Sequence, residues 1–254
     1  YELARDQFER SRALFTQLRG PEHSDTLKVM NNLAISYYNL GRHGEALELR
    51  EKTLARQRTR DEPDTEGLLA GMNNLAESYH AAGRYDDARK LYENTLVEAK
   101  AKLTDRHPKT HLVMNNLAWL LATARDPKVR DAKRAIELAE AVVRLSPTNA
   151  GHHGTLGTAR YRIGAYEQSA LDLEKAIIIR GESDSINANE SFFLAMARVQ
   201  LGDKPGAREW FDKGVAWMNR SKSRTDEVRR FRAEAAELLG IKDAAKVADS
   251  TTLR

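Results

Sequence analysis

The chain has 254 residues, of which 31% are charged, and its 41 basic and 37 acidic side chains leave a formal net charge of +4. It contains no cysteine, which excludes disulfides, thiolate metal sites and a cysteine nucleophile within this chain. No apolar run approaches the ~18 residues of a membrane-spanning helix, and the start does not resemble a signal peptide, so we expect a cytoplasmic protein that binds no membrane.

The first predicted element is a lone helix over residues 1–19, with apolar residues Leu3, Phe8, Leu14 and Leu18. We interpret this helix as the second half of a repeat whose first half is missing. The chain also lacks an initiator methionine. Both observations lead us to expect a fragment of a longer protein.

Residues 20–123 contain an internal repeat. The tetrapeptide Asn-Asn-Leu-Ala occurs at residues 31–34, 73–76 and 115–118, each time after a methionine and each time 42 residues from the last copy. A fixed period of a few tens of residues is typical of stacked supersecondary units. The sequence therefore predicts a repeat scaffold.

Each repeat has the apolar pattern of two helices. Met30, Leu33, Ala34 and Tyr37 follow the spacing of one helical stripe, and Gly41 predicts the end of that helix. A second stripe follows at Ala46, Leu47, Leu49, Thr53 and Leu54. Because neither helix can bury its stripe alone, neighbouring helix pairs must stack.

The period changes after the third copy. Asp126-Pro127 breaks the first helix, and residues 131–145 form the second helix of the third repeat, which is complete at 146. Residues 147–218 contain two shorter repeats, residues 219–240 supply a capping helix that shields the last apolar face, and residues 241–254 form a tail. Repeat five carries an apolar row at Phe192, Met196 and Val199, for which we favour burial by the terminal helix over contact with a ligand.

The small residues indicate a family. A Leu-Ala pair in the first helix, a Gly seven residues after that Ala, and a small and a bulky residue in the second helix resemble the tetratricopeptide repeat. The 42-residue period, the Asn-Asn-Leu-Ala core and the opening His107-Pro108-Lys109-Thr110 resemble the variant in kinesin light chains. The resemblance implies an all-α, right-handed superhelical solenoid of tetratricopeptide helix pairs with a C-terminal capping helix.

A second resemblance concerns the later segments. Residues 119–123, 193–197 and 230–236 resemble the C-terminal repeat region of certain bacterial serine/threonine kinases. That resemblance implies a catalytic domain upstream, so that this chain would be the non-catalytic arm of a larger bacterial signalling protein.

The sequence offers no enzyme chemistry. His107 and His111 lie across a helix start with no acidic residue that completes a zinc-protease pattern, and adjacent helical residues such as His152 and His153 point about 100° apart. Glycines at 151, 154 and 157 lack a following Gly-Lys-Ser/Thr, so close packing explains them better than phosphate binding. We expect no catalytic residues, no metal site and no cofactor.

The asparagines are the candidate site. Asn is a mediocre helix former, so six of them inside three helices need a reason, and a carboxamide can hold both the N–H and the C=O of an extended peptide. Groove asparagines of kinesin-light-chain-like repeats do this, and the resemblance implies a concave groove here. The predicted groove residues are Asn31, Ile35, Tyr38, Asn73, Glu77, His80, Asn115 and Trp119, with Asn32, Asn74 and Asn116 beside them, nearer the adjoining repeat. The alternative is that one Asn of each pair ties its helix to the neighbouring repeat.

We therefore predict a protein–protein interaction scaffold that holds an extended peptide or a partner helix. Two alternatives stay open: a helical repeat that binds nucleic acid, and a self-assembly module. The basic clusters, around Arg50 to Arg60 and around Arg220 to Arg232, lie at helix ends or linkers, where solvated positive charge is the more ordinary interpretation. The sequence therefore does not favour nucleic acid as the partner.

Overall fold

The computed structural model describes residues 2–59, 64–181, 187–221 and 225–241, and every regular element in them is an α-helix. The predicted tail lies outside these residues, apart from its first position. The helices are α1 (Glu2–Arg19), α2 (Ser24–Asn39), α3 (His43–Arg58), α4 (Thr65–Ala81), α5 (Tyr85–Leu103), α6 (Pro108–Thr123), α7 (Ala132–Leu145), α8 (Ala150–Arg162), α9 (Tyr166–Arg180), α10 (Ala188–Gln200), α11 (Lys204–Arg220) and α12 (Asp226–Leu238).

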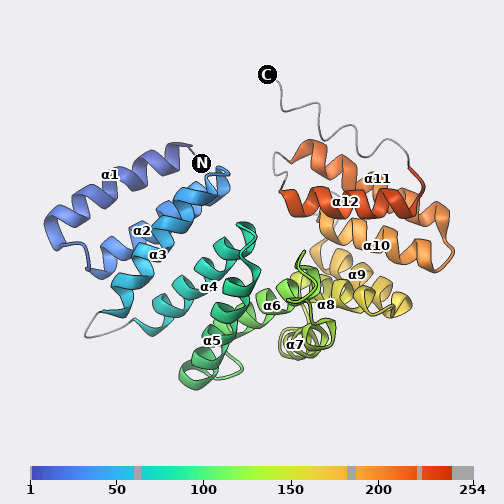
Figure 1. The fold of residues 1–254 in the computed structure, drawn as a ribbon, viewed down its shortest axis with the longest axis horizontal. Coiled ribbons are helices and arrows are strands. Elements are labelled where there is room, and N and C mark those ends of the chain that lie inside the picture. The colour runs from blue at the N-terminus through green and yellow to red at the C-terminus, as the bar shows by residue number, and fades with distance from the viewer. Residues whose placement is uncertain (1, 60–63, 182–186, 222–224, 242–254) are drawn as a thin grey trace. The chain divides into compact units, whose positions relative to one another are not determined.

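The helices pack in sequential pairs, so the predicted all-α solenoid of helix pairs is confirmed. The chain forms two compact units, residues 1–130 and 131–254. The first contains α1 to α6 and the second α7 to α12 (Figure 1).

In the first unit, the hairpin turns and helix starts follow from the repeated sequence. Gly41 and Gly83 both have φ of +76°, a left-handed conformation that costs glycine little. His23 and His107 accept a backbone N–H with Nδ1, and Asp64 accepts one with Oδ1. These contacts satisfy amide groups that a helix start leaves without an intrahelical partner.

The core of the first unit lies between the paired helices. Leu33, Leu75 and Leu117 are at most 4% exposed. They pack among the other buried stripe residues, of which Leu27, Met30, Ala34 and Leu49 form one cluster and Leu54, Leu68 and Met72 surround Leu75 in the next. α1 packs on α2 without a fully buried residue of its own. The apolar stripes predicted from the sequence therefore form the inter-helix core.

In the second unit, glycines of α8 allow close packing. A Cβ on Gly157 would lie 2.7 Å from Leu173 Cγ, and one on Gly154 would lie 2.5 Å from Glu190 Oε1. Contacts this short would force the neighbouring atoms to move. Close packing, as predicted from the sequence, therefore accounts for Gly157, and Gly154 lies against the Glu190 side chain.

Two of the three residues in the apolar row of the fifth repeat are buried, and Val199 is half-buried. Phe192 and Met196 are at most 1% exposed, and the Phe192 ring lies 5.7 Å from that of Phe211 in α11. The ring that meets the terminal helix is instead Phe193, 4.7 Å from Phe231 of α12. Burial of the row was predicted, but α11 covers Phe192. No helix within the described residues has both the length and the apolar character needed to cross a membrane.

Candidate functional site

The predicted groove residues lie on the first helices α2, α4 and α6, beside the buried leucines. On α2, Asn32 and Ile35 are exposed, Ile35 by 40%, whereas Asn31 and Tyr38 are half-buried. Asn31 also borders a small cavity of about 30 Å³ near the start of α4. The α2 row is therefore the part of the predicted surface most open to solvent.

Asn73 on α4 is not open to solvent. Asn73 is only 4% exposed, and its Oδ1 accepts a hydrogen bond of 3.1 Å from Nδ2 of Asn116 on α6. This corrects the prediction that Asn73 faces an open groove, because a buried carboxamide that is already bonded cannot hold a peptide backbone. The pair Asn73–Asn116 instead ties two neighbouring repeats together, as the alternative interpretation proposed.

The remaining predicted residues on α4 and α6 are half-buried: Asn74, Glu77, His80, Asn115 and Trp119. The His80 ring lies 5.7 Å from that of Tyr85, and the Tyr38 ring lies 4.9 Å from that of His43. These two aromatic pairs span the turns of their helix pairs. Part of the Tyr38 ring is therefore covered by His43, and part of the His80 ring is covered by Tyr85.

Arg50 is a site residue that the sequence did not reveal. Its guanidinium, on α3, is only 3% exposed and donates to the backbone carbonyl of Asn74 at 2.6 Å and to Ser78 Oγ at 2.7 Å. It also lies 3.4 Å from Glu77 Oε2 and 5.1 Å from the centre of the Tyr38 ring. The prediction that Arg50 belongs to a solvated helix end is wrong, since helix pairing buries it.

The electrostatics of this cluster follow from burial. Burial lowers the pKa of Arg50, while Glu77 and other neighbours oppose that shift; the guanidinium still stays charged at any ordinary pH. Burial likewise raises the pKa of Glu77, and Arg50 works against it. The Arg50 guanidinium thus bonds to α4, where it lies 3.4 Å from Glu77, one of the predicted groove residues.

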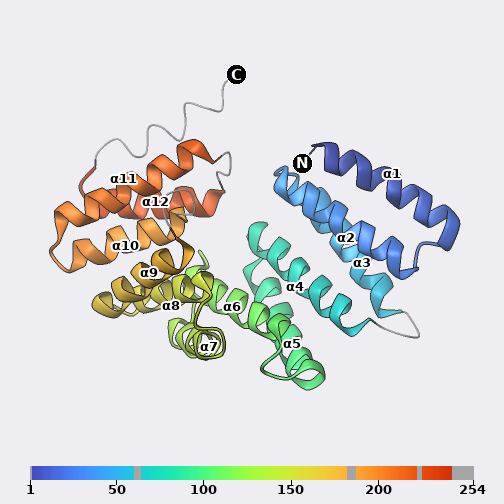
Figure 2. The same ribbon diagram turned by 180° about the vertical axis from the view of Figure 1, so that it is seen from behind.

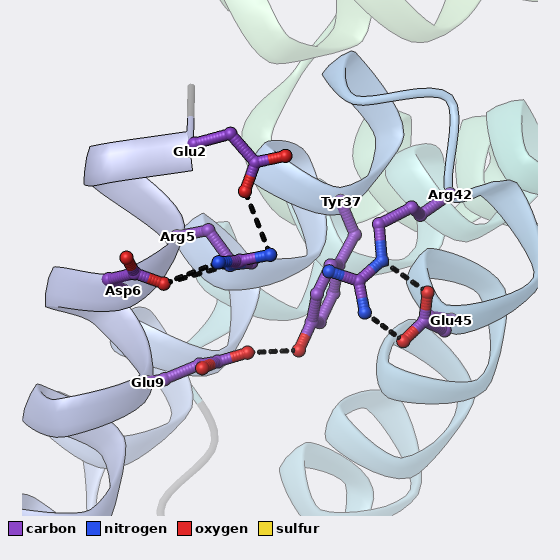
Figure 3. A network of polar contacts seen from close by, with 7 residues as sticks. All are labelled: Glu2, Arg5, Asp6, Glu9, Tyr37, Arg42 and Glu45. Carbon is purple, nitrogen blue, oxygen red and sulfur yellow. Dashed lines mark hydrogen bonds and ion pairs between the residues drawn. The ribbon is translucent and has the colours of Figure 1, made fainter.

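A second set of contacts joins consecutive repeats. The Tyr37 hydroxyl donates to Glu9 of α1 at 2.6 Å, and the Arg42 guanidinium stacks 4.6 Å from the Tyr37 ring while it pairs with Glu45 (Figure 3). Beside them, Arg5 bonds Glu2 and Asp6 within α1. The same arrangement recurs 42 residues later: Tyr79 donates to Glu51 at 2.9 Å, and Arg84 stacks 4.1 Å from Tyr79 and bonds Asp87 at 2.8 Å.

This Tyr–Glu joint is structural. Burial is the main reason that the pKa of Tyr37 and that of Tyr79 are raised, and each Glu acceptor adds to the effect. The sequence repeats Gly41-Arg42 as Gly83-Arg84, 42 residues later, which places the stacked arginine in both joints. A hollow of about 420 Å³ lies beside the first joint, between α1, α2 and α3, and its lining includes Arg12, Met30, Tyr37 and Arg56.

Burial removes Asn73 from the predicted surface of the first unit. Asn31, Asn32, Ile35, Asn74 and Glu77 form its part on α2 and α4, which offers carboxamides, one carboxylate and one aliphatic side chain. Such groups can bond a peptide backbone and bury an apolar side chain. In the part of the chain that the structure describes, no three His, Asp or Glu residues gather as metal ligands would.

Comparison with known proteins gives the context of this arrangement. Residues 1–59 and 68–129 match the family model described as tetratricopeptide repeat. Among curated protein sequences, no match is found.

Several solved structures share the fold. BtubC (BKLC) from P. vanneervenii is 21% identical, with a TM-score of 0.65, over 88% of this chain and 94% of that one. A thermophilic tetratricopeptide repeat protein of Thermus thermophilus is 18% identical, with a TM-score of 0.60, over 85% and 100%. A putative kinesin light chain of Podospora anserina with nearly identical repeats is 24% identical, with a TM-score of 0.59, over 79% and 99%.

Proposed function

The chain is a tetratricopeptide repeat protein with structural similarity to kinesin-light-chain-like repeat proteins, and from this premise we propose that it binds an extended peptide on the first helices of its first unit. Proteins built from this repeat are generally protein–protein interaction scaffolds. We place the peptide site on the surface formed by Asn31, Asn32 and Ile35 of α2 with Asn74 and Glu77 of α4. We call it the α2–α4 surface.

One observation carries this proposal: Ile35 is 40% exposed on the face where Asn31 and Asn32 also lie, while Leu33 between them is fully buried. The fold therefore does not require an isoleucine at position 35. A bound peptide strand is held by backbone hydrogen bonds and by apolar contacts of its side chains. The carboxamides can supply the hydrogen bonds, and the exposed Ile35 side chain can supply the apolar contact.

The asparagines have two different roles in this proposal. Asn31, Asn32 and Asn74 supply donors and acceptors to the peptide, whereas Asn73 and Asn116 hold the repeats together. Because carboxamides bond any backbone, apolar contact with Ile35 is the contribution that selects among peptides. Glu77, held by Arg50, disfavours an acidic residue at the adjoining peptide position.

The resemblance to repeat regions of bacterial kinases leads us to place this scaffold in the non-catalytic arm of a larger bacterial signalling protein. Burial of Arg50 weighs against the nucleic-acid alternative, because its guanidinium is 3% exposed and bonded to α4 and so cannot reach a phosphate.

The test is a pair of matched substitutions, Ile35→Asp and Val97→Asp. Both place a carboxylate at an exposed aliphatic position of a helix in the first unit, and Val97 on α5 is 68% exposed. Peptides selected from a display library on the unaltered chain are titrated against both variants. We expect Ile35→Asp to weaken binding by at least tenfold and Val97→Asp to change it by less than twofold. Equal effects of the two changes, or a library that yields no binding peptide, would contradict the proposal.

A further inference from the structure

The terminal helix α12 packs differently from the other helices that follow a pair. α4, α6 and α10 each lie mainly on the second helix of the preceding pair, whereas α12 lies mainly on α10, the first helix, and less on α11. Both views show α12 alongside these two helices (Figures 1 and 2). α12 is therefore displaced toward the face of the first helices, where a scaffold of this kind is expected to hold its ligand.

Phe231 and Glu234 of α12 both contact this face. Phe231 is fully buried, and its ring meets that of Phe193 on α10 edge-on at 4.7 Å. Glu234, three residues later, accepts two hydrogen bonds from Arg162 of α8, at 3.2 and 2.9 Å. α12 thus reaches back past the fifth repeat to the first helix of the fourth.

The face under α12 has the character of a recognition surface. Arg162 lies 4.9 Å from the Phe193 ring and 5.7 Å from the Tyr161 ring, and Phe193 lies 5.5 Å from Tyr161. An aromatic pair with a fork-shaped cation can bind an aromatic ring and a carboxylate together. Burial is also the main reason that the pKa of Tyr161 is raised to about 12.

The attachment of α12 is modest for a helix of 13 residues. Its buried residues are Val228, Phe231, Ala235 and Ala236, and Glu234 is 37% exposed at the side chain. A helix this short is marginal by itself in water, so its order depends on the contacts with α10 and α8. Its covalent connection to α11 supplies a high effective concentration that favours the docked state.

We propose that the face of α8 and α10 formed by Tyr161, Arg162 and Phe193 is a receptor for an amphipathic helix that presents an aromatic residue and, three residues later, a carboxylate. In this chain α12 occupies the receptor itself. A partner helix of the same chemistry binds by displacing α12, so the receptor is closed until the partner competes successfully. This site is separate from the α2–α4 surface, and neither proposal depends on the other.

The first test uses the full chain and a fluorescent peptide with the sequence of residues 225–240. Glu234→Ala removes the carboxylate that Arg162 holds and weakens the internal competitor, while Glu237→Ala makes the same chemical change at an exposed position of α12. We expect the Glu234→Ala chain to bind the peptide at least fivefold more tightly than the unaltered chain, and the Glu237→Ala chain to match the unaltered one. Equal affinities for all three chains would overturn the proposal and leave α12 as a fixed cap.

The second test reverses the charges. A chain that carries Arg162→Glu and Glu234→Ala is titrated with the natural peptide and with the same peptide bearing Glu234→Arg. We expect this chain to prefer the altered peptide by at least fivefold, because its carboxylate then faces a guanidinium. A preference for the natural peptide, or none at all, would show that Arg162 does not recognise the helix.

Discussion

At the scale of single residues, the asparagines show how one side chain type takes two roles in the same repeat. Asn73 is buried and bonded to Asn116, whereas Asn31, its equivalent one repeat earlier, is half-buried beside a small cavity. The backbone setting is the same in both helices. What differs is the bond that Nδ2 of Asn116 on α6 donates to Oδ1 of Asn73.

This difference predicts unequal costs for the same substitution. Asn73→Ala removes the acceptor of the Asn116 amide and should lower the free energy of unfolding by about 1–3 kcal/mol. Asn31→Ala, the matched control, should change it by less than about 0.5 kcal/mol, and Leu75→Ala should lower it by about 2–5 kcal/mol because it opens a cavity in the core. Chemical denaturation measures all three. An Asn73→Ala variant as stable as Asn31→Ala would show that the tie contributes nothing.

The asparagine and arginine positions also mark the limit of sequence reasoning. Six asparagines inside helices indicated that their side chains have partners, but a tie between repeats and a bond to a peptide use the same donors and acceptors. Arg50 shows the same limit, since it lies in a run of basic residues that looks solvated. Its burial follows only from the packing of α3 against α4, which brings Asn74 and Ser78 within bonding distance.

At the scale of helices, the apolar stripes were sufficient to predict the pairs. Met30, Leu33 and Ala34 have the spacing of one face, and all three are buried where α2 meets its neighbours. The joints between pairs were harder to predict, because Tyr37 and Tyr79 lie on the same stripe and looked like ordinary core residues. Their hydroxyl groups instead reach Glu9 and Glu51 on the preceding second helix.

The Tyr–Glu joint predicts a specific loss. Tyr79→Phe keeps the ring under Arg84 and removes only the hydrogen bond to Glu51, so it should lower the free energy of unfolding by about 0.5–1.5 kcal/mol. Tyr85→Phe is the control, since Tyr85 lies just past the turn and contributes its ring to the His80 pair. Thermal unfolding of the two variants compares them directly. If both lose the same stability, the hydroxyl of Tyr79 has no part in the joint.

At the scale of the molecule, the 42-residue period carried the most information. It predicted the stacked helix pairs of the first unit, and the shorter repeats after it predicted those of the second. The period could not predict that α12 would lie on α10 more than on α11, because α12 belongs to no repeat and its place depends on the contacts of Phe231 and Glu234. Handedness of the superhelix stays a prediction from the resemblance.

The central claim, that the α2–α4 surface binds a peptide, can be tested with a single reporter, because Ile35 is the only isoleucine in residues 1–130. Nuclear magnetic resonance of the chain labelled at isoleucine δ1 methyl groups follows a titration with a library-selected peptide. We predict that the Ile35 methyl resonance moves saturably while that of Ile178, which is 77% exposed on α9, stays in place. A peptide that saturates the chain and leaves the Ile35 resonance unmoved would contradict the account.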